Sequence, residues 1–293
     1  MSITEKCTVC SSEESSVKSL YSKLLRLPEI YSIKECGDCN LIRLSPTPDQ
    51  DESSKHYDDS EYYSPDIYKK RAKIRTPFFL KRLAFISKYT NGKKILDFGC
   101  GGGDFLSIAK DLGYDCFGVE PTIKLAQSAK EKIGERIFGS LSKTIESGIK
   151  FNCVHSNHSF EHVLNPYAVS TNVSKVLVDD GIFILEVPHQ FTSWQDQIKL
   201  ILYKVLGRKI SNKILTKPVD SLHHNYFYTP KTLKNILVST GFMVVYISTI
   251  NKAHYKNHKP FIKKITYFLI DHFFSFFDKG PVIVCVAKKL NQN

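Results

Sequence analysis

Short apolar runs alternate with amphipathic segments from about residue 91 to the end of the chain. The apolar runs predict strands and the amphipathic segments between them predict helices. Strands are expected at 95–97, 116–120, 136–138, 151–156, 182–187, 242–248 and 282–287, and helices at 104–112, 122–132, 141–146, 166–177 and 230–241. This alternation predicts an α/β domain with a doubly wound, mostly parallel, seven-stranded sheet and helices on both faces. A ligand would then lie at the carboxyl ends of the strands.

The same pattern divides the chain into three parts. Residues 1–45 are poor in apolar residues and form a predicted small lobe, and residues 46–90 form a polar linker and helical cap. The cap helix is expected to start at residue 76 or 77 and to end at residue 89. Residues 91–293 form the predicted α/β domain, with helical insertions near 191–228 and 249–281.

A glycine-rich turn follows the first predicted strand of this domain. Asp97, Gly99, Gly101 and Gly103 stand at alternate positions in the run ILDFGCGGGDFL. Glycines let the backbone pass close under a ligand, and the helix that follows offers free N–H groups. The third glycine of a dinucleotide fingerprint would fall on Asp104, so this spacing argues against that ligand class. At the position between two of the glycines, the backbone of Cys100 matters more than its thiol.

The second predicted strand ends in an acid, Glu120, which is followed by Pro121. A carboxylate in this place can accept hydrogen bonds from both hydroxyls of a ribose. Because NAD enzymes use the same device, Glu120 supports adenosine binding without choosing the cofactor.

Two CxxC pairs occupy the predicted small lobe: Cys7 with Cys10, and Cys36 with Cys39. Two such pairs can surround one tetrahedral zinc ion. Disulfides are a poorer explanation in a reducing cytosol. We therefore expect a structural zinc site from which the lobe gains folding energy.

The spacing D-x-G-x-G-x-G resembles motif I of the class I S-adenosylmethionine-dependent methyltransferases. The resemblance implies a Rossmann-like fold, with Asp97 placed where it can pair with the methionyl ammonium and with Gly99, Gly101 and Gly103 making room for the cofactor. A second segment, NHSFEHVLNP at 157–166, resembles the LEHVxxP segment of a large methyltransferase group. That resemblance implies cofactor contacts for Asn157 and His158.

Two readings of the next residues stay open. Glu161 and His162 either face the substrate or cap the following helix and brace its loop. A third segment, LHHNYFYTPKTL at 222–233, resembles an HxxxFTPxTL segment of the same group and aligns His224 with the family histidine. A histidine here can act as a general base near neutral pH, with His223 as a further candidate. For a carbon acceptor, Tyr63 is our candidate to stabilise an enolate.

The order of these segments resembles zinc-ribbon methyltransferases related to the sugar C-methyltransferases, which act on nucleotide-linked deoxysugars. The formal charge of +12 in 293 residues is consistent with an anionic acceptor. Nucleic acid is not favoured, because the chain contains no dense block of Lys and Arg. The expected function is therefore C- or O-methylation of a nucleotide- or lipid-linked sugar or a related small metabolite. An RNA-modifying or nucleic-acid-binding zinc protein, and a non-catalytic protein with the cofactor fold, remain alternatives.

No apolar run reaches the length of a membrane span, and the N-terminus does not resemble a signal peptide, so a cytoplasmic protein is expected. Two stretches, 197–217 and 261–277, combine apolar or aromatic residues with charged ones. Each could lie on a membrane surface, cover a substrate as a lid, or form a homodimer face.

Overall fold

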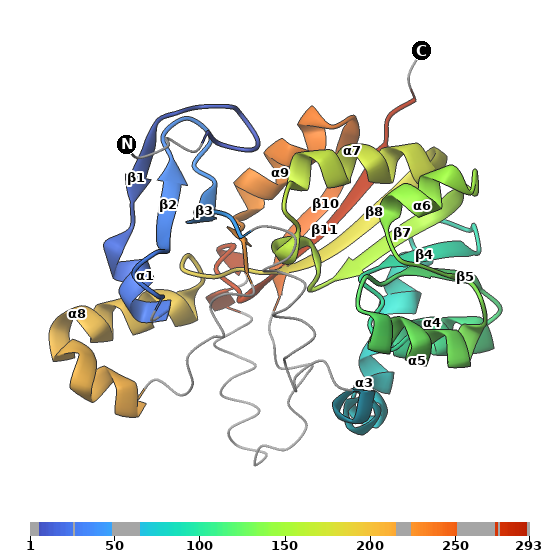
Figure 1. Cartoon of the computed structure of the whole chain (residues 1–293), viewed down its shortest axis with the longest axis horizontal. Helices are drawn as coiled ribbons and strands as arrows, with labels where there is room; N and C mark the ends of the chain where they lie inside the picture. Colours follow the sequence, from blue (N-terminus) through green and yellow to red (C-terminus); the bar gives the residue numbers. More distant parts are fainter. Residues whose placement is uncertain are drawn as a thin grey trace.

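The computed structural model describes residues 6–25, 27–48, 65–214, 224–250, 273–274 and 276–291. Its main feature is a seven-stranded sheet in the order β10-β11-β8-β7-β4-β5-β6 (Figure 1). The strands are β4 (Lys94–Phe98), β5 (Asp115–Val119), β6 (Ile137–Phe138), β7 (Phe151–Asn157), β8 (Leu177–Pro188), β10 (Phe242–Ile250) and β11 (Val282–Lys289). Strands β8, β7, β4, β5 and β6 are parallel, whereas β11 and β10 are antiparallel additions at one edge. The predicted doubly wound, mostly parallel sheet is confirmed.

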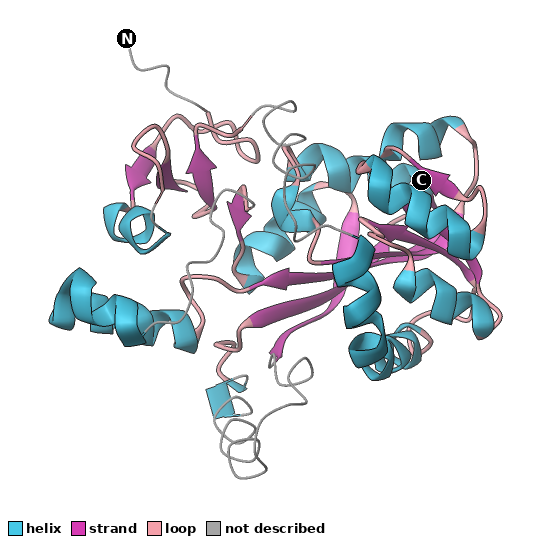
Figure 2. Ribbon diagram, turned by 60° about the horizontal axis from the view of Figure 1, so that its bottom comes forward, coloured by secondary structure: helices cyan, strands magenta, loops and turns pink. Residues whose placement is uncertain are grey.

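Helices cover both faces of this sheet (Figure 2). On one face α3 (Pro65–Ile86), α4 (Asp104–Asp111) and α5 (Ile123–Ile133) bury residues such as Leu83, Leu106 and Ala129. The other face is covered by α6 (Leu141–Glu146), α7 (Pro166–Val176) and α9 (Pro230–Ser239), through residues that include Val173 and Leu237. The apolar positions that predicted each helix are therefore the ones that close the core.

Two predicted boundaries are wrong. The cap helix does not start at residue 76 or 77, because α3 begins at Pro65 and contains Pro77. A proline inside a helix removes one hydrogen bond, but Phe78 and Phe79, directly after it, are buried against the sheet and α4 and hold the helix in place. Strand β8 begins at Leu177, five positions before its predicted start, because Leu177 already pairs with Phe151, and an irregularity that contains the left-handed Asp180 separates this pair from that of Ile182 with Cys153.

The N-terminal part forms a second, four-stranded sheet at one end of the large one (Figure 2). Its strands are β1 (Ser15–Val17), β2 (Ser32–Cys36), β3 (Ile42–Ser45) and β9 (Tyr226–Phe227), and α1 (Ser19–Leu25) packs beside them. Because β9 follows β8 and α8 in the chain, the sheet of the lobe is completed by residues far outside 1–45. Its small core likewise includes Phe191 and Phe227.

Helix α8 (Trp194–Ile214) leaves the body of the molecule beside α1 (Figure 1). Within the described residues, no helix combines the length and apolar character that crossing a membrane requires.

Candidate functional site

The glycine loop joins β4 to α4 at the carboxyl edge of the large sheet. Gly99 and Gly103 have φ of 76° and 75°, a conformation that side chains rarely adopt. A Cβ at Gly99 would lie 2.1 Å from Ser159 Oγ, and one at Gly103 would lie 2.9 Å from Ala129 Cα. The loop therefore needs glycine both for its backbone angles and for its close contacts with neighbouring segments.

Glu120, directly after β5, holds the glycine loop through hydrogen bonds of its carboxylate. Its Oε2 accepts a hydrogen bond from the Gly101 N–H (2.8 Å), and its Oε1 accepts one from the Thr122 N–H (2.9 Å). Burial raises the pKa of this carboxyl group above its ordinary value, although the hydrogen bonds act in the opposite direction. Each oxygen keeps a second lone pair, so the carboxylate can still accept from ribose hydroxyls. Pro121, which follows it, is exposed.

Asp97 pairs with a residue that the sequence reasoning missed. The register of β4 and β7 places His155 beside Asp97, and His155 Nδ1 lies 2.7 Å from Asp97 Oδ1. Both side chains are buried, and the ring of Phe105 stacks on His155 with centroids 4.3 Å apart. A histidine near the carboxyl end of a strand that lies beside the strand of the motif I acid is a signal that could have suggested this contact.

Two other loop residues have defined roles in packing. Asp104 forms an ion pair with Lys132 of α5, and the same lysine donates to the Gly102 carbonyl. The acid that stands in place of a third glycine thus ties α4 to α5. Cys100 is buried, which raises the pKa of its thiol, and its backbone N–H donates to the Val119 carbonyl (3.0 Å).

A cluster of histidines surrounds a buried glutamate after β7. Glu161 lies in the short 3-10 helix η2 (Phe160–His162) and is 1% exposed. Its Oε1 is 3.4 Å from His158 Nδ1, 3.8 Å from His162 Nε2 and 3.9 Å from His224 Nε2. Burial opposes ionisation of Glu161, but the three histidines outweigh it and lower its pKa to about 2.

The structure excludes helix capping as the role of Glu161 and His162, while a substrate-facing role stays a prediction. The helix α7 is capped by Asn165, whose side chain accepts from the Ala168 N–H, so Glu161 and His162 do not cap it. Instead, the rings of His162 and His224 meet edge to face with centroids 4.8 Å apart. Gln190 holds His224 from the other side, with its Oε1 2.5 Å from His224 Nδ1.

The cluster lies next to the glycine loop. Ser159 donates from its hydroxyl to the Gly99 carbonyl (3.4 Å), and it comes two residues before Glu161. The preceding residue, His158, has a positive φ of 53° and donates its N–H to the Glu186 carbonyl (2.8 Å). Asn157, at the end of β7, stands beside Glu186 in the sheet register. The structure thus brings the predicted cofactor segment and two predicted catalytic histidines to one edge of the sheet.

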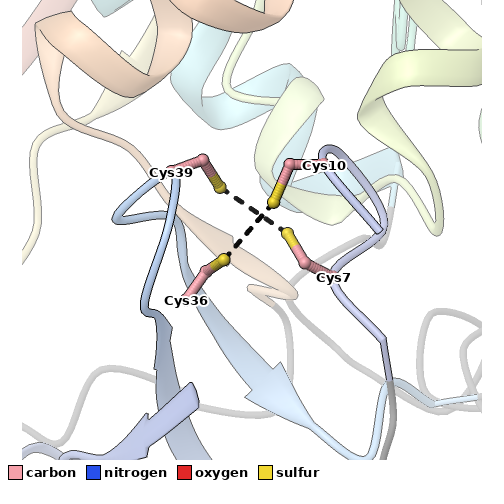
Figure 3. Close-up of side chains that lie close together, drawn as sticks. All are labelled: Cys7, Cys10, Cys36 and Cys39. Carbon is pink, nitrogen blue, oxygen red and sulfur yellow. Dashed lines mark hydrogen bonds between the residues drawn. The ribbon is translucent and has the colours of Figure 1, made fainter. Parts of the chain in front are cut away.

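The four cysteines of the lobe point toward one centre (Figure 3). The sulfurs of Cys7 and Cys39 are 3.6 Å apart, those of Cys10 and Cys36 are 3.4 Å apart, and all four lie within 4.8 Å of one another. These separations are too long for disulfides and close to the ~3.8 Å edge of a tetrahedron with zinc–sulfur bonds of about 2.3 Å. The cluster therefore fits a zinc ion.

These cysteines differ in acidity, because burial raises the pKa of Cys10 and Cys39 while hydrogen bonds lower that of Cys36. Burial opposes ionisation of Cys36, but backbone hydrogen bonds from Cys39 and Asp38, helped by neighbouring thiols, lower its pKa to about 7. A thiolate is the form that binds a metal ion.

Comparison with known proteins identifies the fold and its chemistry. A family model described as a methyltransferase domain matches residues 70–247, more than half of the chain. The chain belongs to this methyltransferase family. The expectation of an S-adenosylmethionine-dependent methyltransferase, drawn from the glycine loop and the segments after it, is thereby confirmed.

Individual relatives of the methyltransferase are distant. A ubiquinone biosynthesis O-methyltransferase of Glaesserella parasuis is 26% identical over 52% of this chain and 67% of its own length. The C-methyltransferase NovU of Streptomyces niveus is 28% identical over 34% of this chain and 25% of its own length. The chain thus matches only a quarter to two thirds of the curated relatives named here.

A solved methyltransferase structure shares the fold of this chain. Phosphoethanolamine N-methyltransferase 2 of Haemonchus contortus, in complex with S-adenosyl-L-methionine, aligns with a TM-score of 0.51 at 14% identity and covers 85% of this chain and 63% of that one. A methyltransferase structure from Archaeoglobus fulgidus aligns with a TM-score of 0.49 at 20% identity and covers 73% of this chain and 94% of that one.

Several predicted sites of the methyltransferase lie outside the described residues: Tyr63, His223, and most of 261–277. The predicted basic stretch 197–217 falls mainly on α8, where Ile198, Ile201 and Val205 are exposed. The start of α8 is fixed by Trp194, which stacks on Phe274 with centroids 5.0 Å apart. Whether these stretches serve a membrane, a lid or a dimer stays a prediction.

Proposed function

We propose that this methyltransferase transfers a methyl group from S-adenosylmethionine to a carbon or oxygen atom of a small, anionic, sugar-type acceptor that is nucleotide- or lipid-linked. The observation that carries the proposal is the buried Glu161 with His162 and His224 beside the glycine loop. A base with a fixed orientation next to the cofactor suits an acceptor that must lose a proton when it is methylated.

The cofactor contacts in this proposal come from the loop and the strand ends around it. Glu120 would accept from the ribose hydroxyls, and the Asp97–His155 pair would lie toward the methionyl arm. The full proposed set is Asp97, Gly99, Cys100, Gly101, Gly103, Glu120, Pro121, Asn157 and His158. When bound, S-adenosylmethionine supplies an electrophilic methyl group on a sulfonium sulfur.

His224 is the proposed general base. With its Nδ1–H donating to Gln190 Oε1, its Nε2 can take the proton that the acceptor loses. Glu161 Oε1, 3.9 Å from Nε2, would then stabilise the protonated ring. His162 is a second candidate because its ring lies against that of His224, while His223 and Tyr63 stay predictions from the sequence.

The acceptor class rests on charge and on similarity. The net charge of +12 favours an anionic acceptor. The similarity to a C-methyltransferase supports transfer to carbon, and the similarity to O-methyltransferases supports transfer to oxygen. We also propose that Cys7, Cys10, Cys36 and Cys39 bind a structural zinc ion, because their sulfur separations fit a tetrahedral site.

The first test is calorimetric binding of S-adenosylmethionine, followed by turnover with a panel of nucleotide-linked deoxysugars. The variant His224→Asn should lower turnover by about 10²–10⁴, while the affinity for the cofactor and the thermal unfolding temperature stay close to those of the wild type. For a keto-sugar acceptor in D2O, the wild type should exchange the α-proton and the variant should not. Undiminished turnover in His224→Asn would remove the base from the mechanism, and failure of the wild type to bind the cofactor would refute the proposed function.

A further inference from the structure

The small sheet of the cysteine lobe and the segment that carries His224 are one hydrogen-bonded unit. Strand β3 pairs antiparallel with β9, so that Arg43 lies opposite Tyr226 and Ile42 lies opposite Phe227. One position further, the Leu44 N–H donates to the Asn225 carbonyl (2.9 Å). In Figure 1 the lobe, with β1, β2 and β3, lies to one side of the large sheet.

Tyr226 joins the cysteine lobe to the histidine–glutamate cluster through a single hydroxyl group. Its side chain is completely buried. The hydroxyl donates to the Leu164 carbonyl (2.8 Å), two residues after His162, and lies 3.0 Å from Thr8 Oγ1. Thr8 belongs to the first knuckle, between Cys7 and Cys10. A tyrosine hydroxyl has one proton to donate, so it accepts from Thr8 while it donates to Leu164.

Asn225 makes the corresponding contact with the glutamate itself. Its backbone N–H donates to the Glu161 carbonyl (2.9 Å), and its side-chain amide donates to the His162 carbonyl (2.8 Å). Asn225 is 3% exposed and stands between His224 and Tyr226. The backbone of Glu161 and His162 is therefore held by the same short segment that carries His224 and completes the lobe's sheet.

We propose that Asn225 and Tyr226 are positioning residues that couple the histidine–glutamate cluster to the cysteine lobe. The state of the four-cysteine site would then control the acceptor side of the active site. The role of the coupling in catalysis rests on the proposed function. The coupling itself follows from the hydrogen bonds of Asn225 and Tyr226.

The cofactor loop is held by other contacts. The Gly99 and Cys100 N–H groups donate to the Val119 carbonyl, and Gly101 donates to Glu120. None of these partners belongs to residues 6–48 or to 224–228, and the contact of the loop with the segment after β7, from the Ser159 hydroxyl to the Gly99 carbonyl, is long at 3.4 Å. The coupling should therefore be selective, so that disturbing the lobe loosens the acceptor side and leaves the cofactor loop in place.

The test uses Tyr226→Phe in the full-length protein, with Tyr228→Phe as the matched control. Tyr228 is equally buried and its hydroxyl donates to the Phe160 carbonyl (3.1 Å), but no described contact of that hydroxyl reaches the lobe. Each variant keeps the ring and removes one hydroxyl. Peptide-level hydrogen exchange then reports separately on residues 6–45, 158–164 and 97–106.

In Tyr226→Phe, exchange should accelerate at least about fivefold in both the knuckle around Thr8 and residues 158–164, as expected when buried hydrogen-bonding groups lose their partner. Residues 97–106 should exchange as in the wild type. In Tyr228→Phe the change should be confined to 158–164 and its neighbours. Faster exchange in Tyr226→Phe that omits the lobe, or that extends to 97–106, would overturn the coupling.

A second variant approaches the coupling from the metal side. Cys39→Ser, with zinc content measured by mass spectrometry, should accelerate exchange in residues 6–45 and also in 158–164 and 224–228. An effect confined to the lobe would contradict the proposal. Failure of the wild type to bind the cofactor would refute the proposed function. The exchange experiment would still test the coupling, because it does not require bound cofactor.

Discussion

Glu120 gives the most direct test of the cofactor site, because both oxygens of its buried carboxylate are already engaged in the free protein. They accept from the Gly101 and Thr122 N–H groups at 2.8 and 2.9 Å. The variant Glu120→Gln keeps the size of the side chain but turns one oxygen into an amino group, which cannot accept. One of the two amides then loses its partner at a residue that is only 6% exposed.

Leaving a buried hydrogen-bonding group without a partner costs about 1–3 kcal/mol. A tenfold change in an equilibrium constant corresponds to about 1.4 kcal/mol, so the dissociation constant for S-adenosylmethionine should rise about 5- to 150-fold. Two causes contribute to this rise: the glycine loop must be reordered on binding, and the ribose hydroxyls lose an acceptor. The free energy of unfolding in urea should also fall, because the bonds exist without the ligand.

The pH dependence of cofactor binding gives a second test of Glu120. Burial raises the pKa of Glu120, so its carboxylate becomes protonated at a higher pH than an exposed glutamate does. The affinity of the wild type for the cofactor should therefore weaken as the pH falls through this raised pKa, at a higher pH than an exposed glutamate would require, and this step should be absent in Glu120→Gln.

Isothermal titration calorimetry of both proteins near neutral and at mildly acidic pH measures these effects. The control is Glu135→Gln, since Glu135 is 82% exposed and pairs only with the surface Lys130 among the described residues. It should bind the cofactor as the wild type does. Unchanged affinity and stability in Glu120→Gln would refute the role that we assign to this carboxylate.

Two further predictions concern stability. Gly99→Ala should lower the free energy of unfolding in urea by about 1 kcal/mol or more beyond the loss in Gly113→Ala. Both glycines have a similar positive φ (76° and 78°), but of these two only Gly99 would bring a Cβ against another atom, Ser159 Oγ at 2.1 Å. Equal losses in the two variants would show that the Ser159 side chain moves aside at little cost. Arg82→Met should cost about 3–5 kcal/mol, because it strips the buried Glu186 of its ion-pair partner, and the double variant with Glu186→Leu should recover most of the loss. Additive losses in the double variant would contradict this account.

The glycine loop and the helix starts could be predicted from local sequence. Gly99 and Gly103 are required by backbone angles that other residues rarely adopt. Thr229 caps α9 through its side chain, and a threonine followed by proline is a local pattern typical of a helix start. These features depend on a few consecutive residues, which is why a single sequence contains them. The start of α3 was missed because a proline is typical of the first turn of a helix, whereas Pro77 lies inside α3.

The partners of the site residues could not be predicted in the same way. Asp97 meets His155 because β4 and β7 lie side by side in a particular register. Glu161 and His224 meet because Asn225 bonds to the backbone of η2. Such contacts join residues that are distant in the chain, and their geometry depends on strand order and register.

The sequence by itself determined that this chain folds as a Rossmann-like methyltransferase and that four cysteines stand at metal-binding spacing, because glycine conformations, strand–helix alternation and CxxC pairs are local. Only the tertiary structure decided that Glu161 lies buried among three histidines and that β9 ties the cysteine lobe to them. The physical reason is that a buried charge and a shared sheet edge exist only once distant segments have packed together.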